Sequence, residues 1–98
     1  MTIDKILNGD TLTIAIGGSL DTMTAPELEN EIRTGLDGVD ELVMDFANLD
    51  YISSAGLRVL LTAHKMMMGR NGMKIIHVNE LVDEVFEVTG FKDVLTIE

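Results

Sequence analysis

Two adjacent hydroxyl side chains, Ser53 and Ser54, are the residues whose type and position best suit chemistry in this chain. They follow the apolar run Leu42–Phe46 and open a segment with helical spacing. Serine is a favoured N-cap, worth about 1 kcal/mol, so capping alone would explain both residues. An exposed serine at a helix N-terminus is also a good phosphoryl acceptor, because the helix dipole and free backbone N–H groups stabilise the added charge of about −2. Both roles are open at this point.

The chain offers little material for catalysis or metal binding. It has no cysteine, and His64 and His77 are its only histidines, without the paired spacing that metal sites use. The segment around Ser54 lacks the Gly-x-Ser-x-Gly elbow of serine hydrolases, because Ile52 takes the first glycine position. We therefore expect no enzyme activity, no metal and no cofactor.

Length and charge limit the class of protein further. The 98 residues suit one domain over 1–98, and the net charge of −10 argues against binding nucleic acid or an anionic membrane surface. A partner with a basic or neutral docking face fits better. The sequence shows no targeting segment and no run near the roughly 20 apolar residues of a membrane span, so we expect a cytoplasmic protein, and a monomer.

The elements that position Ser54 follow from hydrophobic periodicity. We expect strands at 2–7 and 11–16, the second ended by Gly17-Gly18, then a helix that begins at Thr24 and runs to Leu36. Thr24 and Glu27 have the spacing of a capping box. Further strands are expected at 41–46, 73–78 and 94–97, with helices from 54 or 55 to 68 and from 79 or 80 to 89. The helix after Ser54 is expected to bury Leu57, Leu60, Leu61, His64, Met67 and Met68.

This order, ββαβαβαβ, predicts an α/β fold. Two antiparallel strands lead into right-handed parallel crossovers, which gives a single mixed β-sheet. Helices are expected mainly on one face of that sheet.

Three segments resemble the STAS domain family, which contains the bacterial anti-sigma factor antagonists. Ser53-Ser54-Ala55-Gly56-Leu57 resembles the family signature, with Ser54 on the phosphorylated position and Ser53 in the place often held by Asp. Gly18-Ser19-Leu20-Asp21 with Thr24-Ala25 resembles the first loop, which helps to bind the kinase. The run Leu42–Phe46 resembles the strand before the signature. The resemblance covers nearly the whole chain in the right order.

The resemblance implies a partner-switching protein. The unphosphorylated form would bind an anti-sigma factor that is also a serine protein kinase, phosphorylation of Ser54 would release it, and a serine phosphatase would restore it. A STAS adaptor that is never phosphorylated, within a transporter or sensory assembly, is the alternative. Arg58, one turn from Ser54, would screen a phosphate or simply be solvated. The partner-binding residues expected beside Ser54 are Asp21, Thr24, Ser53, Ala55, Gly56, Leu57, Arg58, Val59, Thr62 and Met66.

Overall fold

Five strands form one mixed sheet whose order in space is their order in the chain, β1-β2-β3-β4-β5. The computed structural model describes residues 1–98. Its strands are β1 (Thr2–Asn8), β2 (Thr11–Leu20), β3 (Glu41–Ile52), β4 (Met73–Ile76) and β5 (Thr96–Ile97). β1 pairs antiparallel with β2, and every later pair is parallel. The predicted mixed α/β sheet is confirmed.

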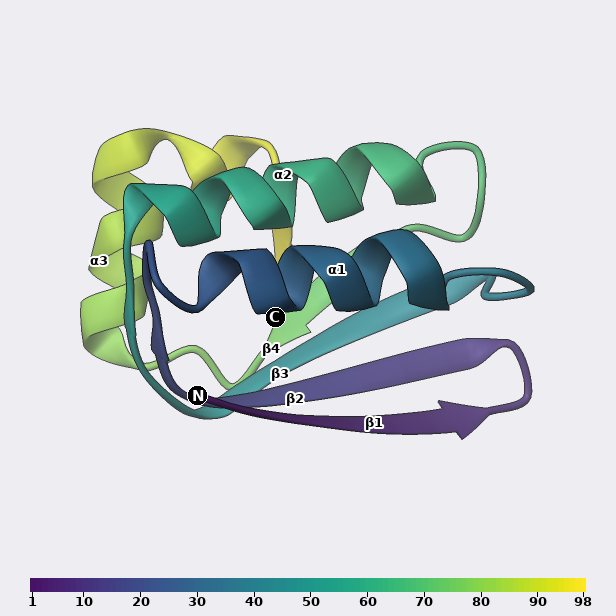
Figure 1. Cartoon of the computed structure of the whole chain (residues 1–98). Coiled ribbons are helices and arrows are strands. Elements are labelled where there is room, and N and C mark those ends of the chain that lie inside the picture. The colour runs from purple at the N-terminus through teal and green to yellow at the C-terminus, as the bar shows by residue number, and fades with distance from the viewer.

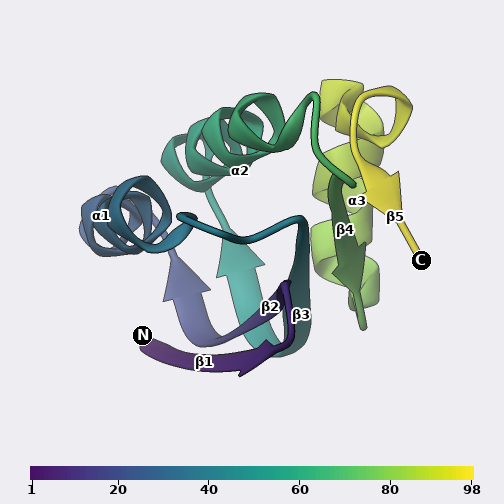
Figure 2. The same cartoon turned by 90° about the vertical axis from the view of Figure 1, so that its right-hand side faces the viewer.

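Three α-helices connect the parallel strands and lie on one face of the sheet. They are α1 (Ala25–Gly35), α2 (Ser54–Met67) and α3 (Glu80–Thr89), and a single 3-10 turn follows at Phe91–Asp93. In Figure 1, α1 and α2 run side by side above the sheet, and the end-on view of Figure 2 shows both on the same side of the strands. None of these helices has the length and apolar character needed to cross a bilayer.

The core lies between the helices and one face of the central strands. Strand register aligns its side chains in rows: Leu12, Leu42 and Met73 form one row, and Ile14, Met44 and Ile75 form the next. The helices fill the space above these rows with buried residues such as Leu28, Ile32, Leu60 and Phe86. The Phe86 ring stacks on that of Phe46, with centroids 6.4 Å apart. A continuous apolar layer therefore holds all three helices to the same face.

Both strands that lead to the site are longer than the sequence predicts. β2 continues through Gly17 and Gly18 to Leu20, and β3 continues past Phe46 to Ile52, with register shifts at two points of their pairing. The glycines allow this extension. A Cβ on Gly17 would lie 2.6 Å from Oγ1 of Thr2, and Gly18 has a φ of +89°. The prediction that Gly17-Gly18 ends the strand was therefore wrong: this pair bends the strand and lets β1 approach it.

The predicted capping box of α1 does not form. Thr24 is the N-cap residue, but its side chain makes no cap bond, because its hydroxyl donates to the carbonyl oxygen of Ser19 at 2.8 Å. The hydroxyl oxygen also accepts the backbone N–H of Asp21 at 2.9 Å. Thr24 thus closes the loop before the helix and leaves Glu27 exposed.

The buried face of α2 also differs from the predicted one. Val59 and Ala63 are buried, whereas Leu61 and His64 are only half-buried and Met68 is 66% exposed. The reason is that α2 packs against α1 as well as against the sheet. Because α2 contacts both, its apolar face is rotated toward α1.

At the C-terminal end the chain turns as predicted, but the last strand is shorter. Gly90 ends α3 in the left-handed conformation, with a φ of +78°. The 3-10 turn at Phe91–Asp93 then occupies the residues before β5, so this strand begins at Thr96 instead of Val94.

Candidate functional site

Ser54 lies where the two central strands of the sheet end. Leu20 at the end of β2 pairs with Ile52 at the end of β3, so the loops that follow these strands emerge together. Both loops lead directly into helices, α1 and α2, whose first turns are visible at the left of Figure 1. The carboxyl ends of parallel strands are the usual place for sites in such sheets.

Ser53 fixes the start of α2. Its backbone is extended, with φ −100° and ψ 177°, and its N–H donates to the carbonyl oxygen of Leu20 at 2.9 Å. Its own carbonyl oxygen accepts the N–H of Leu57 at 3.0 Å. The Ser53 hydroxyl caps nothing: Oγ is buried and has no hydrogen-bond partner. Ser53 therefore holds the start of α2 through its backbone and not through its side chain.

Ser54 is the first residue of α2 and is exposed to solvent. Its hydroxyl has no hydrogen-bond partner in the protein, in contrast to that of Thr24. The first N–H groups of a helix have no intrahelical acceptors, so a negative charge added here meets free donors and the positive end of the helix dipole. The position can accept a phosphoryl group without the loss of an existing contact.

Gly56 lets α2 approach the sheet closely. A Cβ at this residue would lie 2.8 Å from Cγ1 of Ile52 and from Cγ of Leu20, and 3.0 Å from the Leu20 carbonyl oxygen. Glycine is thus required at this position by space, although its φ is not in the left-handed region. The close approach sets the height of Ser54 above the strand ends.

A tight turn forms the other half of the site. Oδ1 of Asp21 accepts the backbone N–H groups of Met23 at 2.9 Å and of Thr24 at 3.1 Å. The hydrogen bond from Thr24 is the main cause that lowers the pKa of the Asp21 carboxyl, with Met23 adding to it against a partial opposing effect of burial. The turn pushes Met23 outward, where 87% of its surface is exposed.

A shallow groove of about 190 Å³ runs between the first turns of α1 and α2. Its floor is apolar and its rim carries one acid and one base, Glu29 and Arg58. Glu29 is paired with Arg33 on its own helix at 3.3 Å, whereas Arg58 makes no ion pair. The lining residues are Thr22, Ala25, Pro26, Glu29, Ala55, Arg58 and Val59.

The structure divides the predicted partner-binding residues into three groups. Arg58 is exposed, and Ala55, Thr62 and Met66 are half-buried on α2. Gly56, Leu57 and Val59 are buried, so the first two support the site from beneath, and Val59 reaches the surface only at the floor of the groove. Asp21, Thr24 and Ser53 are half-buried and shape the two loops by hydrogen bonds.

Residues of the first loop and of α1 that the sequence analysis missed also belong to this surface. They are Thr22, Met23, Pro26 and Glu29. An apolar Met is normally assigned to a core, and only the turn closed by Asp21 reveals that Met23 points outward. Pro26 and Glu29 are recognisable once the first turn of α1 is known to face that of α2.

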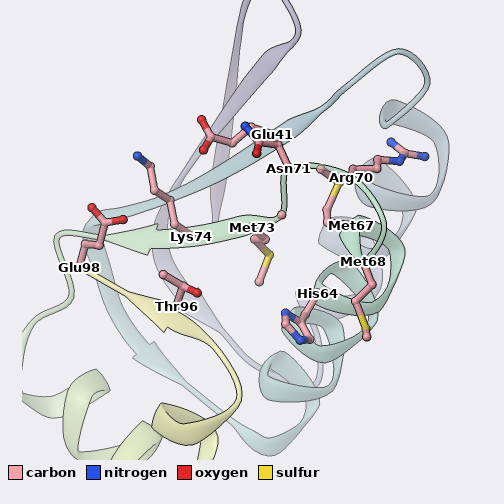
Figure 3. Close-up of a pocket in the computed structure, with 11 residues that line it drawn as sticks. Glu41, His64, Met67, Met68, Arg70, Asn71, Met73, Lys74, Thr96 and Glu98 are labelled. Carbon is pink, nitrogen blue, oxygen red and sulfur yellow. The ribbon is translucent and has the colours of Figure 1, made fainter.

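A larger hollow, of about 330 Å³, lies at the opposite end of α2. Figure 3 shows His64 and Met67 from α2 around it, with Met68 just after that helix, Met73 and Lys74 from β4 and Thr96 from β5. Arg70 lines it, but one of its guanidinium nitrogens already donates to the carbonyl oxygens of Leu36 and Val39. The hollow thus lies away from Ser54, and the Arg70 guanidinium beside it is engaged in holding the backbone.

The fold and this site define a STAS domain. The family model described as "STAS domain" matches residues 2–98, and the chain belongs to that family. The anti-sigma factor antagonists of this family are regulatory proteins and not enzymes.

Proteins that are similar to this chain in sequence are named as anti-sigma factor antagonists. The chain is 37% identical over 100 residues to BtrV of Bordetella bronchiseptica, a candidate anti-sigma factor antagonist, covering 99% of this chain and 84% of that protein. It is 31% identical over 87 residues to the anti-sigma-B factor antagonist of Staphylococcus aureus, covering 86% of this chain and 80% of that protein.

Solved structures of low sequence identity share the fold. An anti-sigma factor antagonist from Mycobacterium paratuberculosis is 21% identical, with a TM-score of 0.88 over 98% of this chain and 83% of that one. SpoIIAA is similar in its unphosphorylated form (16% identical, TM-score 0.76, 99% and 87% covered). Its phosphorylated form from Bacillus is equally similar (17% identical, TM-score 0.75, 99% and 91% covered).

Proposed function

We propose that this chain is an anti-sigma factor antagonist whose binding to its partner is switched by phosphorylation of Ser54. The observation that carries the proposal is the exposed, unbonded hydroxyl of Ser54 at the first position of α2, held on a backbone that is tied to the sheet. The names of its relatives give the partner class, an anti-sigma factor.

The unphosphorylated protein binds this partner through the surface around Ser54. That surface consists of the groove between α1 and α2, the exposed Met23 and the half-buried residues of α2. Its apolar floor supplies contact area, and Met23 supplies a flexible apolar side chain that adapts to the partner. A partner that covers Ser54 must exclude water from it, so an added phosphate is costly to bury there.

The partner is itself a serine protein kinase in this proposal. The Oγ atom of Ser54 attacks the γ-phosphorus of ATP, the bond from that phosphorus to the bridging oxygen breaks, ADP leaves, and the hydroxyl proton passes to a base of the kinase. A serine phosphatase later adds water across the phosphoester bond, which returns Ser54 and inorganic phosphate. The reactions take place in the cytoplasm, on a monomeric protein.

Phosphorylation of Ser54 can act as a switch because the fold tolerates the phosphate and the interface does not. The start of α2 tolerates a phosphate, because the helix dipole and its free N–H groups stabilise negative charge. SpoIIAA has this fold both in its unphosphorylated and in its phosphorylated form, which supports a fold that bears the modification. The interface does not tolerate it, since the phosphate adds about −2 to the contact surface.

Labelling with the cognate kinase tests the proposal. The kinase is identified by affinity capture on the unphosphorylated protein, purified, and incubated with the protein, magnesium and labelled ATP. We expect label on the wild type and on Ser53→Ala, the matched control for a neighbouring hydroxyl, and none on Ser54→Ala. Calorimetry should then show that Ser54→Asp binds the kinase at least about 10-fold more weakly than the wild type. Label on another residue, or full binding by Ser54→Asp, would refute the switch.

A further inference from the structure

We propose that Arg58 pairs with a phosphate on Ser54, so that phosphorylation forms an ion pair between two residues that lie one helical turn apart on α2. The inference rests on the proposed function, because it takes Ser54 as the modified residue. It adds a specific role for Arg58, which is exposed and unpaired in the structure.

Spacing places the two side chains together. Residues four apart on a helix have Cβ atoms about 5–6 Å from each other, and the favourable order is acid first, base second. Ser54 and Arg58 have that spacing, and a phosphate on Ser54 would give that order. The neighbouring helix shows the same arrangement already formed, because Glu29 pairs with Arg33 at 3.3 Å with identical spacing and order.

No carboxylate competes for Arg58. Glu29 lines the same groove, but it is the partner of Arg33. Thr62 donates its hydroxyl to the backbone carbonyl oxygen of Arg58, and this bond leaves the guanidinium free. The next basic residues on α2 are His64 and Lys65, six and seven residues after Arg58 and therefore about 9–10 Å further along the helix axis. Arg58 is the one strong base on α2 within reach of Ser54.

The chemistry of the two groups fits. A guanidinium presents its N–H donors in a planar fork that binds two phosphate oxygens at once, and such charge-assisted bonds are stronger than neutral ones. Lysine would supply only a point charge. We therefore expect the pair to depend on arginine and not on positive charge alone.

The pair changes the sign of charge at the rim of the groove. Before phosphorylation Arg58 contributes +1 at this place, on a chain whose net charge is −10, and it can meet a carboxylate of the partner. Afterwards the sum of +1 and about −2 is about −1. Phosphorylation thus removes an attraction as well as adding a repulsion, because the same guanidinium serves either the partner or the phosphate.

The test uses protein with phosphoserine inserted at position 54 during synthesis, so that no kinase is needed. The second pKa of the phosphate, ordinarily near 6, is measured by ³¹P NMR titration. We expect Arg58→Ala to raise this pKa by roughly 0.15–0.4 pH unit relative to the protein with Arg58, and Arg58→Lys to raise it by less. Lys65→Ala, the matched control on the same helix, should leave it unchanged.

The proposal is overturned if Arg58→Ala leaves the phosphate pKa where the protein with Arg58 has it, or if Lys65→Ala shifts it equally. Arg58→Gln replaces Arg58→Ala if the alanine variant does not fold. Melting temperatures of the unphosphorylated forms separate a structural effect, which would change them, from phosphate pairing, which would not. Because the phosphate is built in, this outcome is independent of kinase labelling: the pair can form even if no kinase modifies Ser54, and labelling can succeed even if no pair forms.

Discussion

The backbone N–H of Ser53 donates to the carbonyl oxygen of Leu20 at 2.9 Å, and this hydrogen bond joins the start of α2 to the end of β2. The two residues are 33 positions apart in the chain. Their bond fixes one loop of the site to the other, so the sheet holds the backbone at Ser54 in place. A phosphate can therefore be added to a frame that does not depend on the Ser54 side chain.

The close approach at Gly56 predicts a large effect of a single methyl group. Gly56→Ala places a Cβ about where Ile52 and Leu20 already lie, so α2 must shift outward. We expect a loss of about 1–3 kcal/mol in the free energy of unfolding, measured by urea denaturation. The matched control is Gly35→Ala at the end of α1, where a Cβ meets nothing within 4 Å. That variant should be neutral or more stable, and an equal loss in both would contradict the account.

Ser53 and Asn79 occupy the same capping position on two helices but should respond differently to alanine. The Asn79 side chain accepts the N–H of Val82 at 2.8 Å and donates to the carbonyl oxygen of Leu49 at 2.8 Å, whereas the Ser53 hydroxyl is buried without a partner. Asn79→Ala should cost about 1–2 kcal/mol of unfolding free energy. Ser53→Ala should cost less than about 0.5 kcal/mol, because it removes an unsatisfied group. Equal losses in the two variants would show that the Ser53 hydroxyl does cap α2.

The Asp21 carboxylate predicts a pH dependence of stability with a defined sign. Its pKa is lowered from 3.8, chiefly by the hydrogen bond from Thr24, so the folded state holds the charged form better than the unfolded state does. The resulting stability is complete above pH 3.8 and is lost as the pH falls through the lowered pKa. Melting curves from pH 7 downward should show the wild type losing its advantage over Asp21→Asn in that acidic range. An advantage that stays constant with pH would disprove the assignment.

Met23 predicts a change in binding without a change in folding. Its side chain is 87% exposed beside the groove, so Met23→Ser removes contact area from the interface but nothing from the core. Affinity for the captured kinase, measured by calorimetry, should fall about 10-fold, whereas unfolding free energy should change by less than about 0.5 kcal/mol. Met68→Ser is the control, because Met68 is 66% exposed at the opposite end of α2. Equal effects of both substitutions on binding would place the interface elsewhere.

Local patterns predicted the elements of this fold but not how far two of them extend. Alternation of apolar residues in β2 and the apolar run of β3 were sufficient to identify both strands, because each has one face in the core. The extension of β2 through Gly17 and Gly18 depends on pairing with residues of β3 about thirty positions later. Glycine within a short window reads as a turn, and only the partner strand shows that the strand continues.

In the candidate site, too, local patterns predicted some features, and contacts between distant segments decided the others. The position of Ser54 at a helix start followed from its own neighbours in sequence. The burial of Val59 did not, because it depends on where α1 lies beside α2. The burial of Gly56 depends on the ends of β2 and β3, and the exposure of Met23 depends on the turn closed by Asp21. Thr24 illustrates the point: its spacing to Glu27 suggested a cap, but a hydrogen bond to Ser19 gives its hydroxyl a different role.

The order of the strands has a consequence for how the molecule is made. Each strand pairs only with its neighbours in the chain, from β1 to β5. A ribosome releases the chain from its N-terminus at about 5–20 residues per second, and every new strand can therefore join the free edge of the strands already paired. No strand has to be inserted between two others, and α2 emerges when α1 and β3, two of the elements that it packs against, have already left the ribosome. The sheet can therefore be assembled during translation in the direction of synthesis, one edge strand at a time.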